Sequence, residues 1–153
     1  MDKEQNRPTL KLVKTYIKDL SFENPNAPKI FLKQDQKHKI DLNLELSNQQ
    51  IDQDHWEIII HIYLEVIDVK DGESTLFIID LEYAGIFLLK NIPKEHMERA
   101  IIVDAPSLLF PYARQLVSQI STDGGFLPFM LEPINFMALY EQKKMQSSDV
   151  PVQ

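Results

Sequence analysis

Alternating apolar and polar residues dominate the first half of the chain and predict four β-strands. The alternation is clearest over residues 56–66, where every second residue is large and apolar. Period-2 patterning of this kind is typical of strands that bury one face. An Asp71-Gly72 pair, which favours a tight hairpin, precedes the last of these segments. The predicted strands cover residues 9–20, 39–46, 56–66 and 74–83.

The last predicted strand has two unlike faces. Its odd-numbered positions are apolar throughout: Phe77, Ile79, Leu81 and Tyr83. Its even-numbered positions are mixed: Leu76, Ile78, Asp80 and Glu82. Successive side chains of a strand point to opposite faces. We therefore expect the apolar row to be covered by other parts of the chain, and the mixed row to face water or a partner.

The last third of the chain changes to helical spacing. Apolar residues recur three or four positions apart over residues 107–120, and again in a second helix that opens at Glu132-Pro133. We expect Pro111 to kink the first helix or to delay its start. Strands followed by helices indicate an α+β domain, with a four-stranded antiparallel sheet and two C-terminal helices on one face. The proline-rich crossing at residues 23–28 makes a Greek-key-like strand order plausible.

The ends of the chain and its composition narrow the class of protein. We expect a single domain over residues 9–145, with flexible segments at residues 1–8 and 146–153. The first residues are charged and show no signal peptide, and no apolar run is long enough to span a membrane. Cysteine is absent and the net charge is −7. These features favour a cytoplasmic protein that neither inserts stably into membranes nor binds nucleic acid.

The motifs of common enzyme classes are missing. With four glycines and no Gly-Lys-Ser/Thr sequence, the chain cannot form a phosphate-binding loop. His55 and His61 lie ~20 Å apart along one predicted strand, too far for a shared metal ion. Asp80 and Glu82 stand on an open strand face, where carboxylates are usually solvated rather than tuned for acid–base chemistry. We therefore expect no enzyme, no cofactor and no metal site.

Large apolar side chains gather in and beside the predicted loops. They are Phe22, Ile30, Phe31, Phe126 and Phe129. Two interpretations remain open. These side chains either anchor ordinary loops against the core, or they line an adaptable groove that accepts extended peptide. Under the second interpretation, we assign Leu42 and Leu44 of the second strand to the same groove.

Three longer stretches resemble the SecB family of protein-export chaperones. Residues 16–28, YIKDLSFENPNAP, resemble the family's signature at the end of its first strand. Residues 109–114, LFPYAR, are similar to its main helix, and residues 131–140, LEPINFMALY, to its C-terminal helix. The segment Gly85-Ile86-Phe87 follows the fourth strand as the family expects. The resemblance covers about residues 9–142, in the order that the patterning predicts.

The resemblance implies an assembly and two partners. SecB proteins are homotetramers, built as dimers of dimers in which first strands pair across subunits. They bind unfolded preproteins without ATP and deliver them to the SecA ATPase. The family's SecA-docking positions match Asp19, Glu23, Ile78 and Asp80. The positions that affect tetramer assembly match Ile79, Leu81 and Tyr83, which we expect to lie beneath helices and to act on assembly indirectly.

One departure from the family concerns the groove. The family's crossover often carries a Trp that lines it, whereas residues 33–37 here read KQDQK, with one extra residue and no Trp. The expected function is that of an ATP-independent holdase for export. Two alternatives stay open: a SecB-like chaperone dedicated to one client such as an antitoxin, and a small enzyme or ligand-binding domain that shares only the fold.

Overall fold

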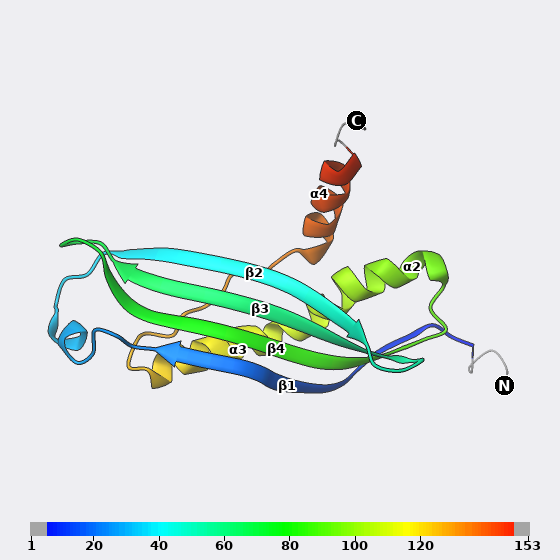
Figure 1. Ribbon diagram of the computed structural model, residues 1–153, viewed down its shortest axis with the longest axis horizontal. Coiled ribbons are helices and arrows are strands. Elements are labelled where there is room, and N and C mark those ends of the chain that lie inside the picture. The colour runs from blue at the N-terminus through cyan, green and yellow to red at the C-terminus, as the bar shows by residue number, and fades with distance from the viewer. Residues whose placement is uncertain (1–5, 149–153) are drawn as a thin grey trace.

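The computed structural model describes residues 6–148 and forms one four-stranded sheet with helices (Figure 1). The strands are β1 (Thr9–Glu23), β2 (His38–Gln50), β3 (His55–Asp68) and β4 (Ser74–Lys90). The short 3-10 helix η1 (Lys29–Leu32) lies in the crossing between β1 and β2. The remaining helical elements are α2 (Lys94–Arg99), the π-helical turn η2 (Ala100–Asp104), α3 (Ala105–Asp123) and α4 (Phe136–Ser148).

The sheet is wholly antiparallel, with the strand order β1-β4-β3-β2. Two hairpins connect β2, β3 and β4. The first strand, β1, pairs with β4 and not with β2, its neighbour in the sequence. This order is a Greek key followed in reverse chain direction. The α+β class and the strand order expected from the sequence are therefore confirmed.

The strands run further than their patterning indicated. β4 continues to Lys90, seven residues beyond the predicted end at Tyr83. Its continuation passes through Ala84 and Gly85, both buried. A Cβ added at Gly85 would lie 3.0 Å from Leu109 Cδ1, so the missing side chain lets α3 approach the strand closely. Small residues hide the alternation of a strand without ending it, which explains the missed extension.

The helical segment starts much earlier than residue 107. α2, η2 and α3 follow one another without a break from Lys94 to Asp123. Pro106 falls in the first turn of α3, where the missing N–H does little harm. Pro111 lies inside α3 and does not delay its start, so that alternative of the sequence expectation is wrong. The charged segment 94–99 lacks the apolar periodicity that would have marked it as helical.

α4 begins at Phe136 rather than at residues 132–133. The Asn135 Oδ1 atom accepts a hydrogen bond from the Ala138 N–H at 3.0 Å, which caps the first turn. The helix runs to Ser148, into the predicted C-terminal tail. At the other end, Asn91 Nδ2 donates to the Arg7 carbonyl at 3.3 Å. The parts of the expected flexible ends at residues 1–5 and 149–153 lie outside the described residues.

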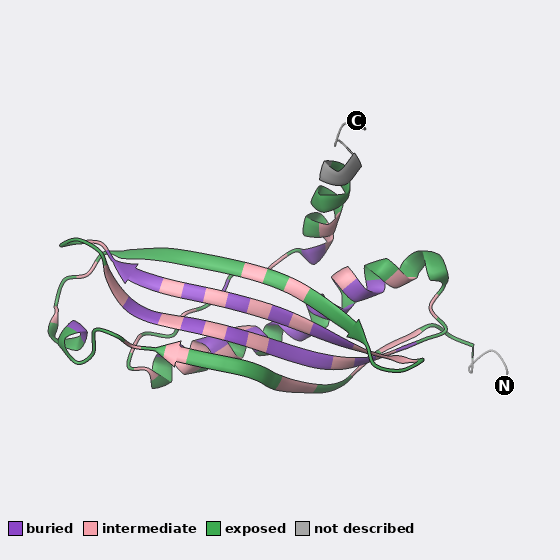
Figure 2. Cartoon of the chain, viewed as in Figure 1, coloured by how far each residue is buried: buried purple, intermediate pink, exposed green. Residues whose placement is uncertain are grey.

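The core lies between α3 and one face of the sheet. Even-numbered β3 residues such as Ile60 and Ile62, with no exposed surface, pack with Leu109 and Val117 of α3. Figure 2 shows the resulting alternation of buried and half-buried residues along β3 and β4. α4 joins this core through Phe136, whose ring lies 5.9 Å from that of Phe110, and then projects away from the sheet (Figure 1). The opposite sheet face is left open, and we call it the outer face.

Candidate functional site

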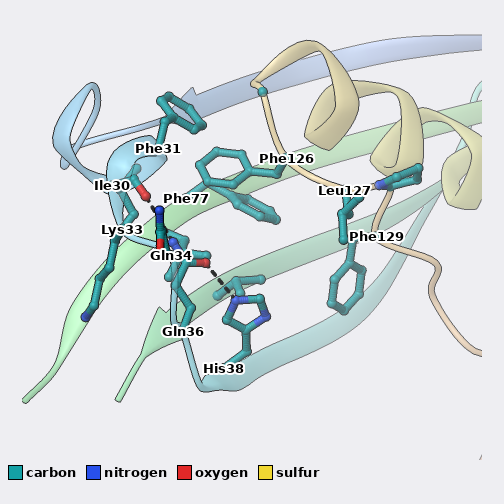
Figure 3. Close-up of a pocket in the computed structure, with 14 residues that line it drawn as sticks. Ile30, Phe31, Lys33, Gln34, Gln36, His38, Phe77, Phe126, Leu127 and Phe129 are labelled. Atoms are coloured by element: carbon teal, nitrogen blue, oxygen red, sulfur yellow. Dashed lines mark hydrogen bonds between the residues drawn. The ribbon is translucent and has the colours of Figure 1, made fainter. Parts of the chain in front are cut away.

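An apolar cavity of about 500 Å³ opens at one end of the sheet, on the helix side (Figure 3). Val66, Leu76 and Phe77 of the β3–β4 hairpin form part of its lining. The β1–β2 crossing and the start of β2 supply Ile30, Phe31, Lys33, Gln34, Gln36 and His38. The segment after α3 supplies Gly125, Phe126, Leu127, Pro128 and Phe129. Three segments far apart in sequence therefore build one hollow.

Aromatic rings form a continuous cluster at this cavity. The centroid of Phe126 lies 5.1 Å from that of Phe31 and 4.7 Å from that of Phe77. Phe22 extends the cluster, with its ring 6.0 Å from that of Phe77. Such tilted and offset contacts are favourable arrangements for aromatic pairs. Phe126 is only half-buried and Phe31 is 46% exposed, so part of the cluster faces solvent.

Two glycines hold the segment after α3 close to these rings. A Cβ added at Gly125 would lie 2.9 Å from the Phe31 ring, and one added at Gly124 would overlap the Phe22 ring. Gly125 also has φ +96°, a backbone conformation that favours glycine. Asn24 reinforces the contact, because its Nδ2 donates to the Gly124 carbonyl at 3.1 Å. The diglycine pair thus sets the distance between two walls of the cavity.

The polar wall of the cavity is anchored by a buried carboxylate. Asp68 at the end of β3 is 1% exposed and accepts hydrogen bonds from Lys33 Nζ and from the N–H groups of Lys37 and Lys70, the last two at 3.1 Å. These donors, led by Lys33, lower the pKa of Asp68 to about 2. Within the wall, Gln36 Nε2 donates to the Ile30 carbonyl at 3.0 Å. Amide and lysine side chains therefore stand in the segment where the family often has a Trp.

The predicted groove residues fall into three positions. Ile30, Phe31, Phe126 and Phe129 line the cavity, with Ile30 almost wholly buried as part of its wall. Phe22 lies behind it and supports Phe77. Leu42 and Leu44 lie outside the cavity, further along β2. Leu42 is 45% exposed, whereas Leu44 is half-buried against the core.

A strip of apolar residues on β2 continues from the cavity mouth. His38 lines the cavity, and Ile40, Leu42 and Leu44 follow at alternate positions on the same strand face. Their partners across the β2–β3 ladder are the buried Val66, Leu64 and Ile62, so the strip belongs to the helix side of the sheet. Ile40 and the polar wall were not among the residues expected at the groove. Ile40 shares the alternate positions of Leu42 and Leu44 on β2, which could have identified it, whereas polar residues in a crossing give no sequence signal of lining a cavity.

The four predicted SecA-docking positions lie together on the outer face. In the β1–β4 ladder, Glu23 is opposite Ile78, Asp19 is opposite Glu82, and Asp80 lies between them, opposite Ser21. The β3–β4 and β2–β3 ladders add further carboxylates: Glu65 lies opposite Ile78 and Asp41 lies opposite Glu65. The outer face is thus acidic from β1 to β2. The two carboxylates on β2 and β3 lay outside the sequence expectation, because only cross-strand register reveals them.

The carboxylates of the outer face affect the pKa of a tyrosine that lies among them. Burial and then the carboxylates of Glu65, Asp41, Asp80 and Glu23 raise the pKa of Tyr63. These four groups come from all four strands, which shows that the charges converge. Beside Tyr63, His61 Nε2 lies 2.6 Å from Asp80 Oδ1.

A second polar cluster lies further along the outer face. Glu57, 8% exposed, accepts hydrogen bonds from Tyr16 Oη and from Lys18 Nζ, the latter at 2.8 Å. Lys18 and then Tyr16 lower the pKa of Glu57, whereas burial and the carboxylate raise the pKa of Tyr16 to about 12. Because these groups satisfy one another, they tie β1 to β3 across β4.

The three predicted assembly positions are buried beneath α3. Ile79 and Leu81 have no exposed surface and Tyr83 is 9% exposed. Tyr83 borders a hollow of about 360 Å³ that is also lined by Ile17 and Tyr112, which are 47% and 49% exposed. Ile79 and Leu81 therefore present no surface that another molecule could contact directly, whereas Ile17 and Tyr112 beside Tyr83 do.

The described residues hold no group of three or more His, Asp or Glu side chains placed to bind a metal ion. Within residues 6–148, no helix is long and apolar enough to cross a membrane.

Comparisons with known proteins agree over nearly the whole chain. The family model described as preprotein translocase subunit SecB matches residues 3–147. The protein-export protein SecB of Desulfotalea psychrophila is 48% identical over 97% of this chain and 94% of its own. That of Magnetococcus marinus is 40% identical over 92% and 88%.

A solved structure has the same fold. It is a SecB-like chaperone of Mycobacterium tuberculosis in complex with a peptide from an antitoxin, with TM-score 0.65 and 17% identity over 82% of this chain and 90% of that one. Taken with the family match and the curated relatives, the cavity and the acidic sheet face belong to a protein of the SecB family, of which this chain is a member.

Proposed function

We propose that the chain is an ATP-independent holdase that binds unfolded preproteins for export. The observation that carries this proposal is the half-exposed aromatic cavity that continues into an open apolar strip on β2. An unfolded chain presents apolar side chains without fixed order, and an elongated apolar surface gains free energy by covering them in many small contacts. The SecB names of the curated relatives support the export role.

The same surface supports binding of many clients. Apolar contacts discriminate weakly between side chains of similar size. The polar wall of the cavity offers the amide group of Gln34, which is suited to the backbone of an extended peptide. The mechanism has no catalytic step: the client is held by binding alone and is released when a partner competes for it.

The outer face is our candidate for docking the SecA ATPase on the cytoplasmic side of the membrane. Its carboxylates from all four strands favour a basic surface of a partner. Asp19, Glu23, Ile78 and Asp80 form the centre of the proposed contact. Since the cavity opens on the helix side of the sheet and the carboxylates lie on the other side, the client and SecA have separate surfaces.

We further propose a homotetramer built as a dimer of dimers. β1 is an edge strand of the sheet, and an unpaired edge is a ready site for strand pairing with a second copy. Next to it, the exposed Ile17, Leu108 and Tyr112 offer apolar surface that a second copy would cover. Several cavities in one assembly would then add avidity for a long client.

A role dedicated to one client is the second candidate. Its support is the fold shared with a chaperone that was solved with an antitoxin peptide. The export role is favoured, because the relatives at 48% and 40% identity are named as export proteins.

Light scattering with an unfolded preprotein tests the proposal. A tetramer of about 4 × 17.8 kDa that gains mass with a reduced, unfolded preprotein, and not with the folded form, is the expected result. Equal gains with several unrelated unfolded proteins would support the general role, and a gain with one client alone would support the dedicated one. A monomer that ignores unfolded proteins would contradict both.

A further inference from the structure

We propose that His61 is a positioning residue for Asp80 and makes docking on the outer face stronger as the pH rises through neutrality. The proposal rests on the docking role proposed above and adds its regulation. His61 Nε2 lies 2.6 Å from Asp80 Oδ1, within hydrogen-bond distance. The two side chains are 38% and 45% exposed, so a partner can reach the pair. Histidine is the side chain whose ordinary titration falls nearest to neutral pH.

The charged groups around His61 are acidic on the flanking strands. Glu45 of β2 and Glu82 of β4 lie directly opposite it in the two ladders. On β1, Asp19 follows Glu82. On β3 itself, the next residue on the same face is Tyr63, a neutral group whose pKa is raised. None of these facing positions is a Lys or Arg. Lys18 of β1 also reaches the outer face, where its Nζ pairs with Glu57, four residues before His61 on β3, so a protonated His61 would add a second cation to this part of the face.

The two protonation states of His61 leave Asp80 in different conditions. A neutral imidazole with its proton on Nε2 donates to the carboxylate, fixes its orientation and leaves its full negative charge to a partner. A protonated imidazole keeps the hydrogen bond but adds a positive charge beside it. The local charge of the docking surface then falls by one unit. The Nε2–Oδ1 contact thus positions the carboxylate in both states, and the proton sets how much charge remains.

A basic partner and the proton on His61 therefore compete for the same carboxylates. Binding of one must weaken binding of the other by the same factor, since coupling between two ligands is reciprocal. One unit charge at about 6 Å, screened by water, corresponds to a change in affinity of roughly three- to tenfold. The sign follows directly: affinity is lower at pH 6 and higher at pH 8.

Three substitutions at His61 separate its charge from its position. His61→Gln keeps a donor for Asp80 and cannot titrate, so it should bind SecA with nearly the affinity of the unmodified chain at pH 8 and retain that affinity at pH 6. His61→Arg carries a fixed positive charge and should bind weakly at both values. His61→Leu removes the donor, and it should bind more weakly than His61→Gln at both values because Asp80 is no longer oriented.

The chain offers a matched control for the titration itself. His55 also contacts a carboxylate, with its Nδ1 2.8 Å from Asp52 Oδ1, and it is likewise partly exposed. It lies six residues from His61 along β3, or ~20 Å at the usual strand rise. His55→Gln should therefore leave the pH profile of docking unchanged.

The experiment is isothermal titration of purified SecA into the full chain and its variants at pH 6.0, 7.0 and 8.0, at constant ionic strength. We expect the pH dependence of the unmodified chain to exceed that of His61→Gln by three- to tenfold. Titration near pH 6.5 in buffers of different ionisation enthalpy should also show protons released on binding, and fewer with His61→Gln. Equal pH profiles and equal proton release for the two proteins would overturn the proposal.

A separate variant distinguishes failure of this proposal from failure of the docking proposal. Asp80→Arg should weaken SecA binding at pH 8. If Asp80→Arg binds normally, the docking assignment itself is wrong. If Asp80→Arg binds weakly but His61→Gln follows the unmodified profile, the docking assignment stands and the role of His61 is wrong.

Discussion

Gly124 packs directly against the ring of Phe22, so closely that an added Cβ would overlap it. We expect Gly124→Ala to destabilise the protein by about 1–3 kcal/mol, the usual cost of forcing an extra carbon into a packed contact. Urea denaturation would measure the change. In a chain that already carries Phe22→Leu, whose side chain lacks the ring, the same substitution should cost clearly less. Equal costs in both backgrounds would show that the two residues are not coupled.

The carboxylate of Asp68 should stabilise the fold in a pH-dependent way. Its folded-state pKa of about 2 lies below the ordinary value of 3.8. Its contribution is therefore fully present above about pH 4 and is lost as the pH falls toward 2. Chemical denaturation of Asp68→Asn should show lower stability than the unmodified chain at pH 6, and the difference should shrink as the pH falls through this window.

Asp71 provides the control for that measurement. It lies 3.4 Å from the same Lys33 Nζ, but its side chain is 72% exposed. Asp71→Asn should therefore change stability little at any pH. A loss as large as that of Asp68→Asn would mean that the charge of Lys33, and not the buried acceptor, holds the crossing in place.

Phe126 should be an anchor for bound clients, because its ring contacts two others at the cavity and stays half-exposed. We expect Phe126→Ala to weaken binding of an unfolded preprotein by about tenfold or more, as for buried aromatic anchors in other interfaces. Fluorescence anisotropy of a labelled, reduced preprotein would measure the affinity. Ile51→Ala removes a more exposed apolar side chain, 52% exposed, from the β2–β3 turn outside the cavity and should have no effect. Equal losses for both variants would argue against the cavity as the client site.

Reversing the charge of Asp19 and Asp80 together should abolish SecA binding, while holding of clients survives. Both carboxylates lie on the outer face, away from the cavity. A variant with Glu132→Lys and Glu141→Lys changes the net charge equally at two exposed positions outside the sheet, and it should dock normally. Titration calorimetry with SecA and an aggregation assay with unfolded client read out the two functions separately. Loss of both functions in the first variant would point to misfolding rather than docking.

Strand patterning predicted the fold well because burial on one face imposes a period that single residues reveal. The buried Ile79 and Leu81 and the half-buried Ile78 and Asp80 follow this rule. Helix α2 was missed because its charged segment is only six residues long and none of its side chains is buried. Hydrophobic patterning predicts an element whose one face is buried. It does not predict a helix such as α2, which buries no side chain and continues directly into η2 and α3.

The candidate site was predictable in its apolar parts and not in its polar ones. Phe31, Phe126 and Phe129 were expected in a groove, and the structure brings them to one cavity. The pairs Lys33–Asp68 and His61–Asp80 join residues 35 and 19 positions apart, and no local pattern specifies such partners. They depend on the end of a crossing and on cross-strand register, which only the folded chain defines. The docking, groove and assembly roles of the named residues stay predictions.

The alternation of β4 between two faces has an evolutionary consequence. Phe77 and Ile79 face the cavity or the core, whereas Ile78, Asp80 and Glu82 face the outer side of the sheet. Leu76, which the sequence pattern placed in the mixed row, is instead buried at the cavity, because the β3–β4 register shifts between Val66 and Ile67. β4 therefore carries two sets of positions on opposite faces of the sheet, and a ligand bound to one face does not contact the other set. Under the proposed roles, substitutions in β4 that alter the client site and substitutions that alter the docking face can therefore arise independently of one another.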